Sequence, residues 1–341
     1  MANRKITWET TTSTDIGIDA TLFGKLNITA DYFYKVTDDI LMKLNVPLII
    51  GMDAPSQNAG KMENRGWEVS VSYADQVGDF NYRASFNISD VRNKILDMRG
   101  VNQTGLTVNR EGYEMYSIYG LEAIGYIQPE DYDAEGNYLG ATQYGNFGPG
   151  DIKYKDLNGD GTIDDNDQTY YSGIYPNNPQ LVYGFGLNVQ YKGIYAGVFF
   201  QGVGKTSVNL KANTSYFVPF ANGKDQSSAR VQAADHWTAS DPNNMNVLYP
   251  RLHTNEYSNN TLNSTWWYRD GSFLRLKNVE LGYQFDKKLV QRWKMQNLRI
   301  YVQGSNLAVW DHVKMWDPEI GNSGARYPIN ATWTFGLDVT F

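Results

Sequence analysis

The clearest capacity for chemistry lies in one oxygen-rich loop, residues 156–167. Oxygen-bearing side chains stand at its first, third, fifth, ninth and twelfth positions, and Gly161 stands at the sixth. Calcium-binding loops have this order, because Ca²⁺ prefers carboxylate, amide and carbonyl oxygens and the glycine permits a sharp turn. We predict a structural calcium ion that pins this loop and offsets the repulsion among its carboxylates. The predicted ligands are Asp156, Asn158, Asp160, the carbonyl of Thr162, Asp164 and Asp167.

Two features separate this loop from a standard EF-hand. Its twelfth position is Asp167 instead of glutamate, so bidentate closure needs a tighter loop. Gly148, Pro149 and Gly150 precede it, where an EF-hand would have a helix. The alternative to calcium is a turn rich in Asp, Asn and Gly that holds itself together without metal.

Aromatic residues in or beside the long loops are candidates for contact with a substrate. Flat aromatic faces stack on sugar rings, and nearby Asn and Asp side chains bond hydroxyl groups. The alternative is that these rings pack within the loops, against the rim of a sheet or against a partner protein. The candidates are Trp237, Trp266, Trp267, Tyr268, Trp310 and Trp316.

Other chemistries find little support in the sequence. The glycines and Lys205 of residues 202–207 do not form a phosphate loop, because the motif needs glycine at residue 199 and no helical pattern follows. His236, His253 and His312 are far apart and the chain has no cysteine, which argues against a zinc site or a catalytic triad. A net charge of −7 argues against a nucleic-acid partner. We therefore predict that the chain is not an enzyme.

The elements that must position these residues are strands with one apolar face. In residues 331–341, Ala, Trp, Phe, Leu, Val and Phe alternate with Thr, Thr, Gly, Asp and Thr. This alternation predicts a strand long enough to cross a bilayer at a tilt. A phase slip at Lys277 and Asn278 in another such segment predicts a β-bulge. The pattern recurs in residues 16–22, 26–34, 67–73, 80–88, 181–191, 194–200, 274–285 and 298–302.

The connections between these segments alternate in length. Transmembrane barrels have short periplasmic turns and long extracellular loops, so the alternation favours a membrane barrel over a soluble sandwich. The chain also lacks the run of 18 apolar residues that a transmembrane helix needs. The short connections are residues 24–25, 75–79, 192–193 and 286–297, the last with a helical turn within 287–295. The long ones are residues 37–65, 89–180, 203–271 and 306–330, of which the second contains the calcium-like loop.

We predict an all-β fold, an antiparallel transmembrane β-barrel portion of about 9–11 strands with long extracellular loops. Nine strands joined in sequence place the first and the last in parallel, so closure needs an odd number of further strands from elsewhere. No apolar core of a signal peptide is present at the start of the chain. We therefore expect residues 1–341 to be the C-terminal part of a larger barrel, without its signal peptide. A soluble, calcium-stabilised β-protein that binds carbohydrate is the alternative.

Several stretches resemble, in the same order along the chain, motifs of the SusC/RagA type of TonB-dependent outer-membrane transporters. They span essentially the whole chain. They are residues 8–19 (WETTTSTDIGID), 150–161 (GDIKYKDLNGDG), 199–202 (FFQG), 270–279 (DGSFLRLKNV), 304–307 (GSNL) and 317–319 (DPE).

The resemblance implies a barrel of about 22 strands with an N-terminal plug. It also implies that the plug domain and the TonB box of such a transporter are not part of residues 1–341. It implies import of nutrients, mostly glycans or peptides, together with a SusD-like lipoprotein that acts as a lid. It also implies a place in the outer membrane of a Gram-negative, Bacteroidetes-like cell, in contact with lipid and lipopolysaccharide. The TonB complex would act through the plug, and the long loops would form the extracellular vestibule. No organic cofactor is expected.

Overall fold

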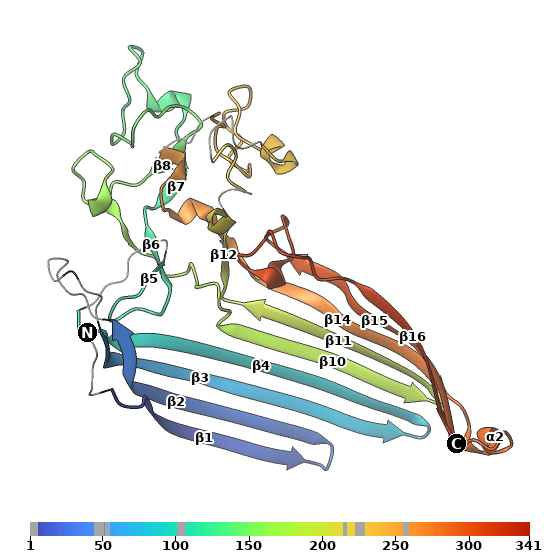
Figure 1. Cartoon of the computed structure of the whole chain (residues 1–341). Helices are drawn as coiled ribbons and strands as arrows, with labels where there is room; N and C mark the ends of the chain where they lie inside the picture. Colours follow the sequence, from blue (N-terminus) through green and yellow to red (C-terminus); the bar gives the residue numbers. More distant parts are fainter. Residues whose placement is uncertain are drawn as a thin grey trace.

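The computed structural model describes residues 6–43, 51, 55–100, 107–213, 217–221, 229–254 and 259–341 of the chain. Its main feature is one sheet of nine long strands, with loops and short elements at one end of them (Figure 1). Within the described ranges, no helix has the length and apolar character needed to cross a membrane. The nine strands are β1 (Thr10–Leu22), β2 (Leu26–Lys43), β3 (Ser56–Val77), β4 (Phe80–Asp97), β10 (Leu181–Tyr191), β11 (Ile194–Gly204), β14 (Phe273–Gln284), β15 (Asn297–Asp311) and β16 (Thr332–Thr340).

The strands of this sheet follow one another in chain order from β1 to β16, and every neighbouring pair is antiparallel. Each alternating segment of the sequence lies in one of these strands, apart from the end residues Phe285, Ala331 and Phe341, so the predicted antiparallel all-β architecture is confirmed. Because the number of strands is odd, the two edge strands run in the same direction. Both β1 and β16 run toward the short connections (Figure 1), in the parallel orientation that the sequence predicts.

Several strands are longer than their alternating segments. β2 continues to Lys43 and β3 begins at Ser56, so much of the connection predicted over residues 37–65 is strand. β4 and β15 likewise extend to Asp97 and Asp311. The predicted boundaries are wrong here because register shifts break the strict alternation of apolar and polar residues near these ends. Such shifts lie between Thr37 and Leu41 of β2, between Lys61 and Met62 of β3, and between β14 and β15, while the hydrogen-bonded ladder continues past each of them.

The phase slip in β14 is a β-bulge, as predicted. Leu276 and Asn278 pair with successive residues of β11, which leaves Lys277 outside the register. The same break appears against β15, where Asn306 has a φ of 55°, a conformation that asparagine tolerates better than most residues. The extra residue keeps the apolar side chains on one face on both sides of the bulge.

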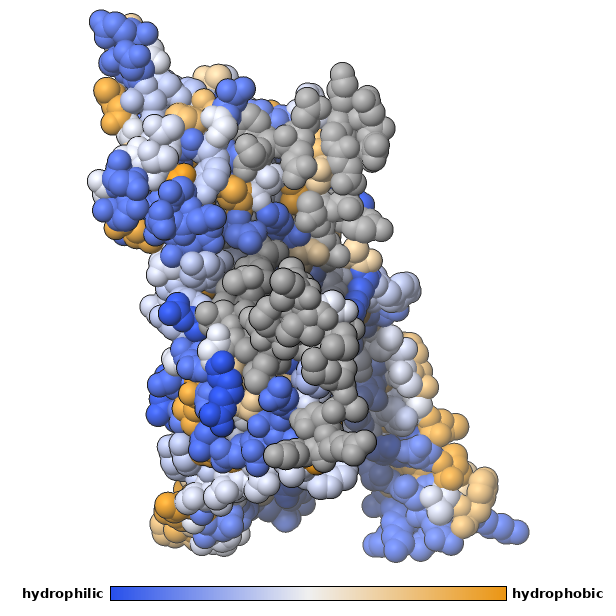
Figure 2. Space-filling model, turned by 60° about the vertical axis from the view of Figure 1, so that its left-hand side comes forward, coloured by the Kyte–Doolittle hydropathy of each residue, from blue (hydrophilic) through white to orange (hydrophobic). Residues whose placement is uncertain are grey.

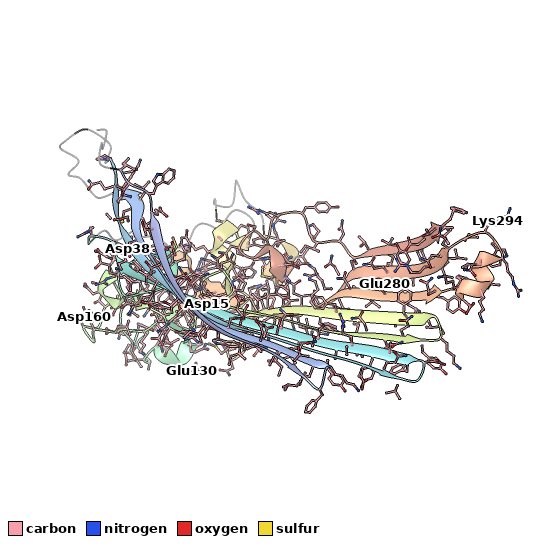
Figure 3. All side chains as sticks on the ribbon, turned by 90° about the horizontal axis from the view of Figure 1, so that it is seen from below. Asp15, Asp38, Glu130, Asp160, Glu280 and Lys294 are labelled. Carbon is pink, nitrogen blue, oxygen red and sulfur yellow. The ribbon has the colours of Figure 1, made fainter. Side chains whose placement is uncertain are left out.

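Short connections lie at one end of the sheet and long ones at the other. Tight turns with positive φ at Gly24, Gly78 and Gly193 join three of the strand pairs. The short helix α2 (Lys287–Gln291) confirms the helical turn predicted between β14 and β15. Figure 3 shows Lys294, just after α2, and Asp160, in the long loops, at opposite ends of the molecule.

Three of the long connections, residues 89–180, 203–271 and 306–330, pack together into one loop region around two small hydrophobic clusters. Residues 89–180 and 203–271 both contribute to the first cluster, and Met315 and Trp316 of the last long connection pack against the second. Its short strands are β5 (Thr107–Val108), β6 (Ser117–Gly120), β7 (Ala123–Tyr126), β8 (Ile152–Tyr154), β9 (Thr169–Tyr170), β12 (Ser207–Asn209) and β13 (Tyr268–Asp270). Its 3₁₀ turns are Pro129–Asp131, Asp165–Asp167, Leu210–Asn213, Val231–Ala234, Asn259–Thr261, Thr265–Trp267 and Pro318–Ile320.

Candidate functional site

The long sheet has one apolar face and one polar face. On β16, Trp333, Phe335 and Leu337 are 61%, 82% and 64% exposed. On β1, at the other edge, Ile16 and Ile18 are 68% and 67% exposed. Figure 2 shows hydrophobic residues gathered at the lower right, where the sheet lies, below a largely hydrophilic upper part. An exposed apolar surface of this extent indicates contact with another apolar phase.

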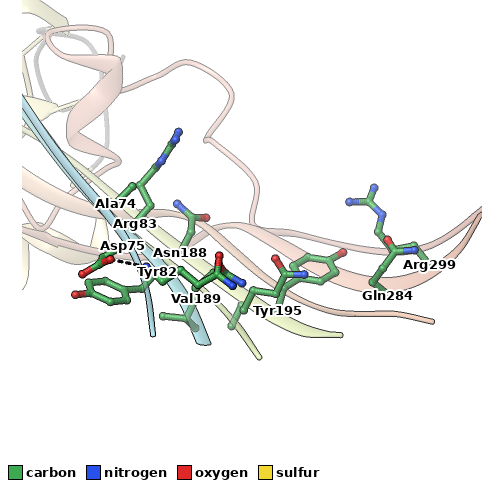
Figure 4. Close-up of a pocket in the computed structure, with 13 residues that line it drawn as sticks. Ala74, Asp75, Tyr82, Arg83, Asn188, Val189, Tyr195, Gln284 and Arg299 are labelled. Carbon is green, nitrogen blue, oxygen red and sulfur yellow. Dashed lines mark hydrogen bonds between the residues drawn. The ribbon is translucent and has the colours of Figure 1, made fainter. Parts of the chain in front are cut away.

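The polar face is hollowed. A groove of about 770 Å³ lies toward its short-connection end (Figure 4). A smaller groove of about 200 Å³ lies further along the same face and includes Thr29, Glu68 and Ser89. Both grooves are lined mainly by side chains from the polar positions of the alternation, so this face is concave and open to polar solutes. The polar side chains of the larger groove include Asn81, Arg83, Asn188, Gln190, Tyr195, Gln284 and Arg299.

Arg299 organises the polar face near the start of β15. Its Nε donates a hydrogen bond of 2.8 Å to Asp338 on β16, and its Nη1 lies 3.8 Å from Glu280 on β14. The guanidinium also lies 4.8 Å from the ring centre of Tyr301 and 5.8 Å from that of Tyr195. These charged groups are paired with one another, so the arrangement stiffens a polar wall and is not a reactive centre.

One buried carboxylate, Asp151, joins three parts of the loop region. It is fully buried, and its Oδ2 accepts hydrogen bonds from Arg251 at 2.6 Å and from the N–H of Gly148 at 2.9 Å. Its Oδ1 lies 2.8 Å from Nε2 of His253 and accepts a bond of 2.9 Å from Asn260. Residues separated by about a hundred positions in sequence therefore meet at one charge. A buried charge of this kind is tolerable only because each of its lone pairs has a donor.

A second buried charge, Arg275 on β14, ties the last long connection to the sheet. The side chain is almost fully buried, with Nη2 at 2.5 Å from Asp317 and Nε at 3.0 Å from Glu319. Asp317 also caps the 3₁₀ turn Pro318–Ile320 by accepting from the N–H of Glu319. Lys277 adds a more exposed ion pair to Glu319 at 3.2 Å. The strand motif at residues 270–279 and the loop motif at 317–319 are thus held together by charge.

Replacement of Arg275 by lysine is expected to loosen this connection. Lysine keeps the charge but cannot reach both carboxylates with a planar fork, so we expect the loop region to lose about 1–2 kcal/mol of unfolding free energy. Proteolytic cleavage within residues 312–330 and thermal unfolding report the change. Lys277→Arg, in the neighbouring and more exposed pair with Glu319, is the matched control. Equal effects of the two substitutions would contradict the role assigned to Arg275.

The predicted calcium loop is compact and ordered. Asp156 accepts hydrogen bonds from the N–H groups of Gly159 at 2.6 Å and Gly161 at 2.8 Å. Gly161 has a φ of 83°, as the sixth position of such a loop requires. Ile163, at the eighth position, is buried in the first hydrophobic cluster, and its N–H donates to the carbonyl of Thr142. The segment that contains Thr142 therefore holds the loop through this backbone hydrogen bond.

Asp167 closes the loop from inside. The side chain is buried, with Oδ1 accepting from the N–H of Leu157 at 2.7 Å and Oδ2 from that of Asp164 at 2.9 Å. Burial raises the pKa of Asp167, but the backbone N–H donors outweigh burial and hold that pKa below its ordinary value. The carboxylate is therefore ionised at neutral pH, as a metal ligand must be.

The loop has the donor types and the turn that calcium requires, but its side-chain oxygens also accept hydrogen bonds from N–H groups within the loop itself. Asn158 donates from its amide to Asp160 at 2.8 Å, and Asp160 and Asp164 each accept from the N–H two residues further along. Among the described residues, no three acidic or histidine side chains converge closely enough to form a ready metal cluster. The chemistry of the donor set fits calcium, and its binding stays a prediction.

Three of the six aromatic candidates are tryptophans that pack inside the loop region. Trp237 and Trp267 are buried, each in one of the two hydrophobic clusters, so neither ring offers a face to a sugar. Trp266 donates to the hydroxyl of Tyr126 and packs edge-on against Trp267. These placements favour the packing alternative for this group of rings. Tyr268 lies in β13, Trp316 packs on Phe217 at 4.3 Å, and Trp310 on β15 is 54% exposed.

Sequence reasoning missed the two charged residues that hold the loops in place. Asp151 and Arg275 both stand inside motifs that the sequence made visible, but no spacing showed that either is buried. A signal was present for Arg275, because its position in the alternation places a charge on a strand next to apolar Leu274 and Leu276. Asp151 carried no comparable signal, since its partners are distant in sequence.

Comparisons with known proteins agree over the whole chain. No family model matches it. TonB-dependent receptor P26 of Formosa agariphila is 31% identical over 367 residues, covering 100% of this chain and 35% of the relative. TonB-dependent receptor SusC of Bacteroides thetaiotaomicron is 26% identical over 365 residues, covering 99% of this chain and 32% of the relative. The chain thus spans about a third of the length of these relatives.

A solved structure has the same fold. The structure of the RagAB peptide transporter superposes with a TM-score of 0.76 at 24% identity, covering 99% of this chain and 36% of that chain. The nine-stranded sheet and its loop region therefore correspond to one part of a larger barrel.

Proposed function

Because the chain belongs to the TonB-dependent receptors of the SusC/RagA type, as a portion of their β-barrel, we propose that it forms part of the wall of an outer-membrane nutrient importer. The observation that carries the proposal is the antiparallel sheet with an exposed apolar face and a hollowed polar face. The apolar face would contact lipid and lipopolysaccharide, and the polar face would line the lumen. Alternate residues of a transmembrane barrel have this division of roles.

The two ends of the sheet then have different tasks. The short connections would lie in the periplasm, and the loop region would form an extracellular vestibule for a glycan or peptide. The same loops would offer a docking surface to a SusD-like lipoprotein. The TonB complex would act on a plug contributed by another part of the protein, in a Bacteroidetes-like cell. The chain itself would catalyse no reaction.

The soluble alternative, a calcium-stabilised carbohydrate-binding β-protein, fits the structure less well. It requires the apolar face to be covered by the protein's own core. Among the described residues, that face is instead exposed from β1 to β16, with Phe335 at 82%. A soluble monomer rarely exposes a contiguous apolar surface of this size.

Cell fractionation combined with uptake measurements tests the import function. The full-length protein is expected in the outer-membrane fraction, together with a lipoprotein that co-purifies with it. Uptake of a labelled oligosaccharide or peptide pool is expected to stop when TonB is deleted, although the pool still binds to the cell surface. A protein in the soluble fraction, or uptake unchanged without TonB, would overturn the proposal.

We also propose that residues 156–167 bind one calcium ion with a structural role. The support is the order of oxygen donors, the positive φ of Gly161 and the ionised Asp167 at the closing position. The ligands would be Asp156, Asn158, Asp160, the carbonyl of Thr162, Asp164 and Asp167. Bound calcium would neutralise clustered carboxylates and hold the loop against the first hydrophobic cluster.

Calcium is expected to raise the thermal stability of the loop region. A ligand at one hundred times its dissociation constant contributes about 2.7 kcal/mol, and chelation removes that contribution. Asp156→Asn should abolish the calcium-dependent rise in Tm in the full-length protein. Asp165→Asn, which alters an adjacent carboxylate outside the ligand set, should retain it. A Tm that does not respond to calcium would leave the metal-free turn as the correct interpretation.

A further inference from the structure

A row of basic side chains continues the apolar face of β3 and β4 toward the long connections. The two strands lie side by side, and residues that pair directly across them point to the same face (Figure 1). On β3, Trp67 of the apolar face is followed two positions nearer the loops by Arg65, which pairs with Arg92 of β4. Two residues further, Lys94 of β4 pairs with Glu63. The basic row, which consists of Arg65, Arg92 and Lys94, therefore starts where the apolar face ends.

The height of the basic row matches the surface of a bilayer. Between residues 80 and 92, β4 advances about 40 Å along its own direction. At a tilt of about 40° this is about 30 Å of height, whereas the apolar band of a transmembrane barrel is about 25 Å tall. Tyr32 and Trp67 form a cross-strand pair just below the row and are 50% and 38% exposed. Exposed aromatic side chains of this kind mark the level of the lipid headgroups.

Two like charges face each other in the basic row. Arg65 and Arg92 stand directly opposite on neighbouring strands, an arrangement that destabilises a sheet. Nε of Arg92 lies 3.1 Å from Asp90, and 51% of the Arg92 side chain stays exposed. Arg65 and Lys94 are exposed, and neither forms a hydrogen bond or an ion pair with any residue that the structure describes. Charge in the row is therefore incompletely neutralised by the chain.

The carboxylates beside the row already have partners. Asp90 is buried and is shared between Arg92 and Lys205. Glu63 accepts a hydrogen bond of 3.0 Å from a tyrosine hydroxyl on β2, and Glu114 accepts one from a glutamine amide. None of these carboxylates forms an ion pair with the other two members of the row. An anion from outside the chain would therefore relieve the repulsion.

We infer that the basic row binds a phosphate group of lipopolysaccharide in the outer leaflet of the outer membrane. The inference rests on the proposed function, which places the long connections outside the cell, and deepens it by naming a lipid contact. Guanidinium groups donate paired hydrogen bonds to phosphate oxygens, so a phosphate between Arg65 and Arg92 would replace repulsion by charge-assisted contacts. Lys94 would add a third positive charge. An acidic segment of a partner protein is less suitable, because the row continues the face that meets lipid.

Native mass spectrometry of the full-length protein in detergent tests this assignment. The probes are diphosphoryl lipid A and the same lipid without its phosphates. Arg65→Gln should weaken binding of diphosphoryl lipid A about fivefold, which corresponds to the ~1 kcal/mol that one basic residue contributes beside an anionic lipid surface. Arg65→Gln combined with Lys94→Gln should weaken it about 25-fold. The parent and the variants should bind the dephosphorylated lipid equally.

Lys35→Gln is the matched control. Lys35 lies on β2 at the same height, but its ammonium group lies 4.8 Å from the ring centre of Phe33, on the polar face of the sheet. The substitution removes one positive charge and should leave the affinity for lipid A unchanged. Equal losses from Lys35→Gln and Arg65→Gln would reduce the effect to net charge and overturn the inference.

Thermal unfolding separates lipid binding from a structural role of Arg65. Without lipid A, Arg65→Gln removes one of two opposed charges, so its Tm should equal or exceed that of the parent. Diphosphoryl lipid A should then raise the Tm of the parent more than that of the variant. A lower Tm of Arg65→Gln in both conditions, no preference for the phosphorylated lipid, or loss of a co-purifying lipoprotein with lipid A binding unchanged would overturn the inference.

The outcome is distinguishable from failure of the import function. TonB-dependent uptake, with lipid A affinity unaltered in the variants, would reject the phosphate site and keep the importer. Phosphate-dependent binding that is lost in the variants, in a protein without TonB-dependent uptake, would keep the site and reject the importer.

Discussion

Asp151→Asn is expected to destabilise the loop region by about 3–5 kcal/mol, the usual result of breaking a buried ion pair. The substitution preserves the shape of the side chain but removes the charge that Arg251 and His253 face. It also places an amide donor where Gly148 and Asn260 already donate. We expect the first unfolding transition, followed by tryptophan fluorescence in the full-length protein, to move to lower temperature.

Two further variants give this prediction its control. Glu130→Gln removes an exposed charge from a neighbouring 3₁₀ turn, and it should leave the transition in place. Arg251→Met combined with Asp151→Asn should recover part of the lost stability, because the guanidinium no longer lacks its partner. An Asp151→Asn protein that unfolds like the parent would show that the charge does not hold the loops together.

Arginine at a lipid-facing position of β16 is expected to disrupt assembly far more than arginine on the other face. Leu337→Arg places a charge near the middle of the strand on the apolar face, with an expected cost of about 2–4 kcal/mol if that face meets the bilayer core. Thr334→Arg is the matched control, because its side chain belongs to the polar face of the same strand.

The folded fraction in outer membranes, measured by the heat-dependent shift in electrophoretic mobility, reports the difference. Urea unfolding in lipid vesicles gives the free energy directly. Equal losses from Leu337→Arg and Thr334→Arg would mean that the two faces share one environment, which the barrel assignment does not allow.

The sequence predicts the strands well because alternation has a physical cause. Each residue between Trp333 and Val339 faces either an apolar or a polar phase, so the pattern records the environment residue by residue. The bulge at Lys277 is visible for the same reason, since one extra residue shifts that pattern by half a period. The strand ends at Lys43 and Asp97 are not visible, because register shifts interrupt the alternation just before them.

The loop region is less predictable because its contacts are distant in sequence. Asp151 meets residues about a hundred positions away, and no local spacing shows which loops will converge. Trp237 and Trp267 look like exposed loop aromatics in sequence, yet each forms part of a hydrophobic cluster. The turn at residues 156–167 is the exception, since its geometry depends on its own glycines and carboxylates.

A lipid-accessibility scan of β16 tests the central claim most directly. The chain contains no cysteine, so single cysteines at residues 332–340 of the full-length protein can each carry one spin label in the outer membrane. We expect high accessibility to oxygen at 333, 335, 337 and 339, and high accessibility to a water-soluble nickel reagent at the residues between them. Uniform accessibility to the nickel reagent along the strand would contradict a membrane-spanning sheet.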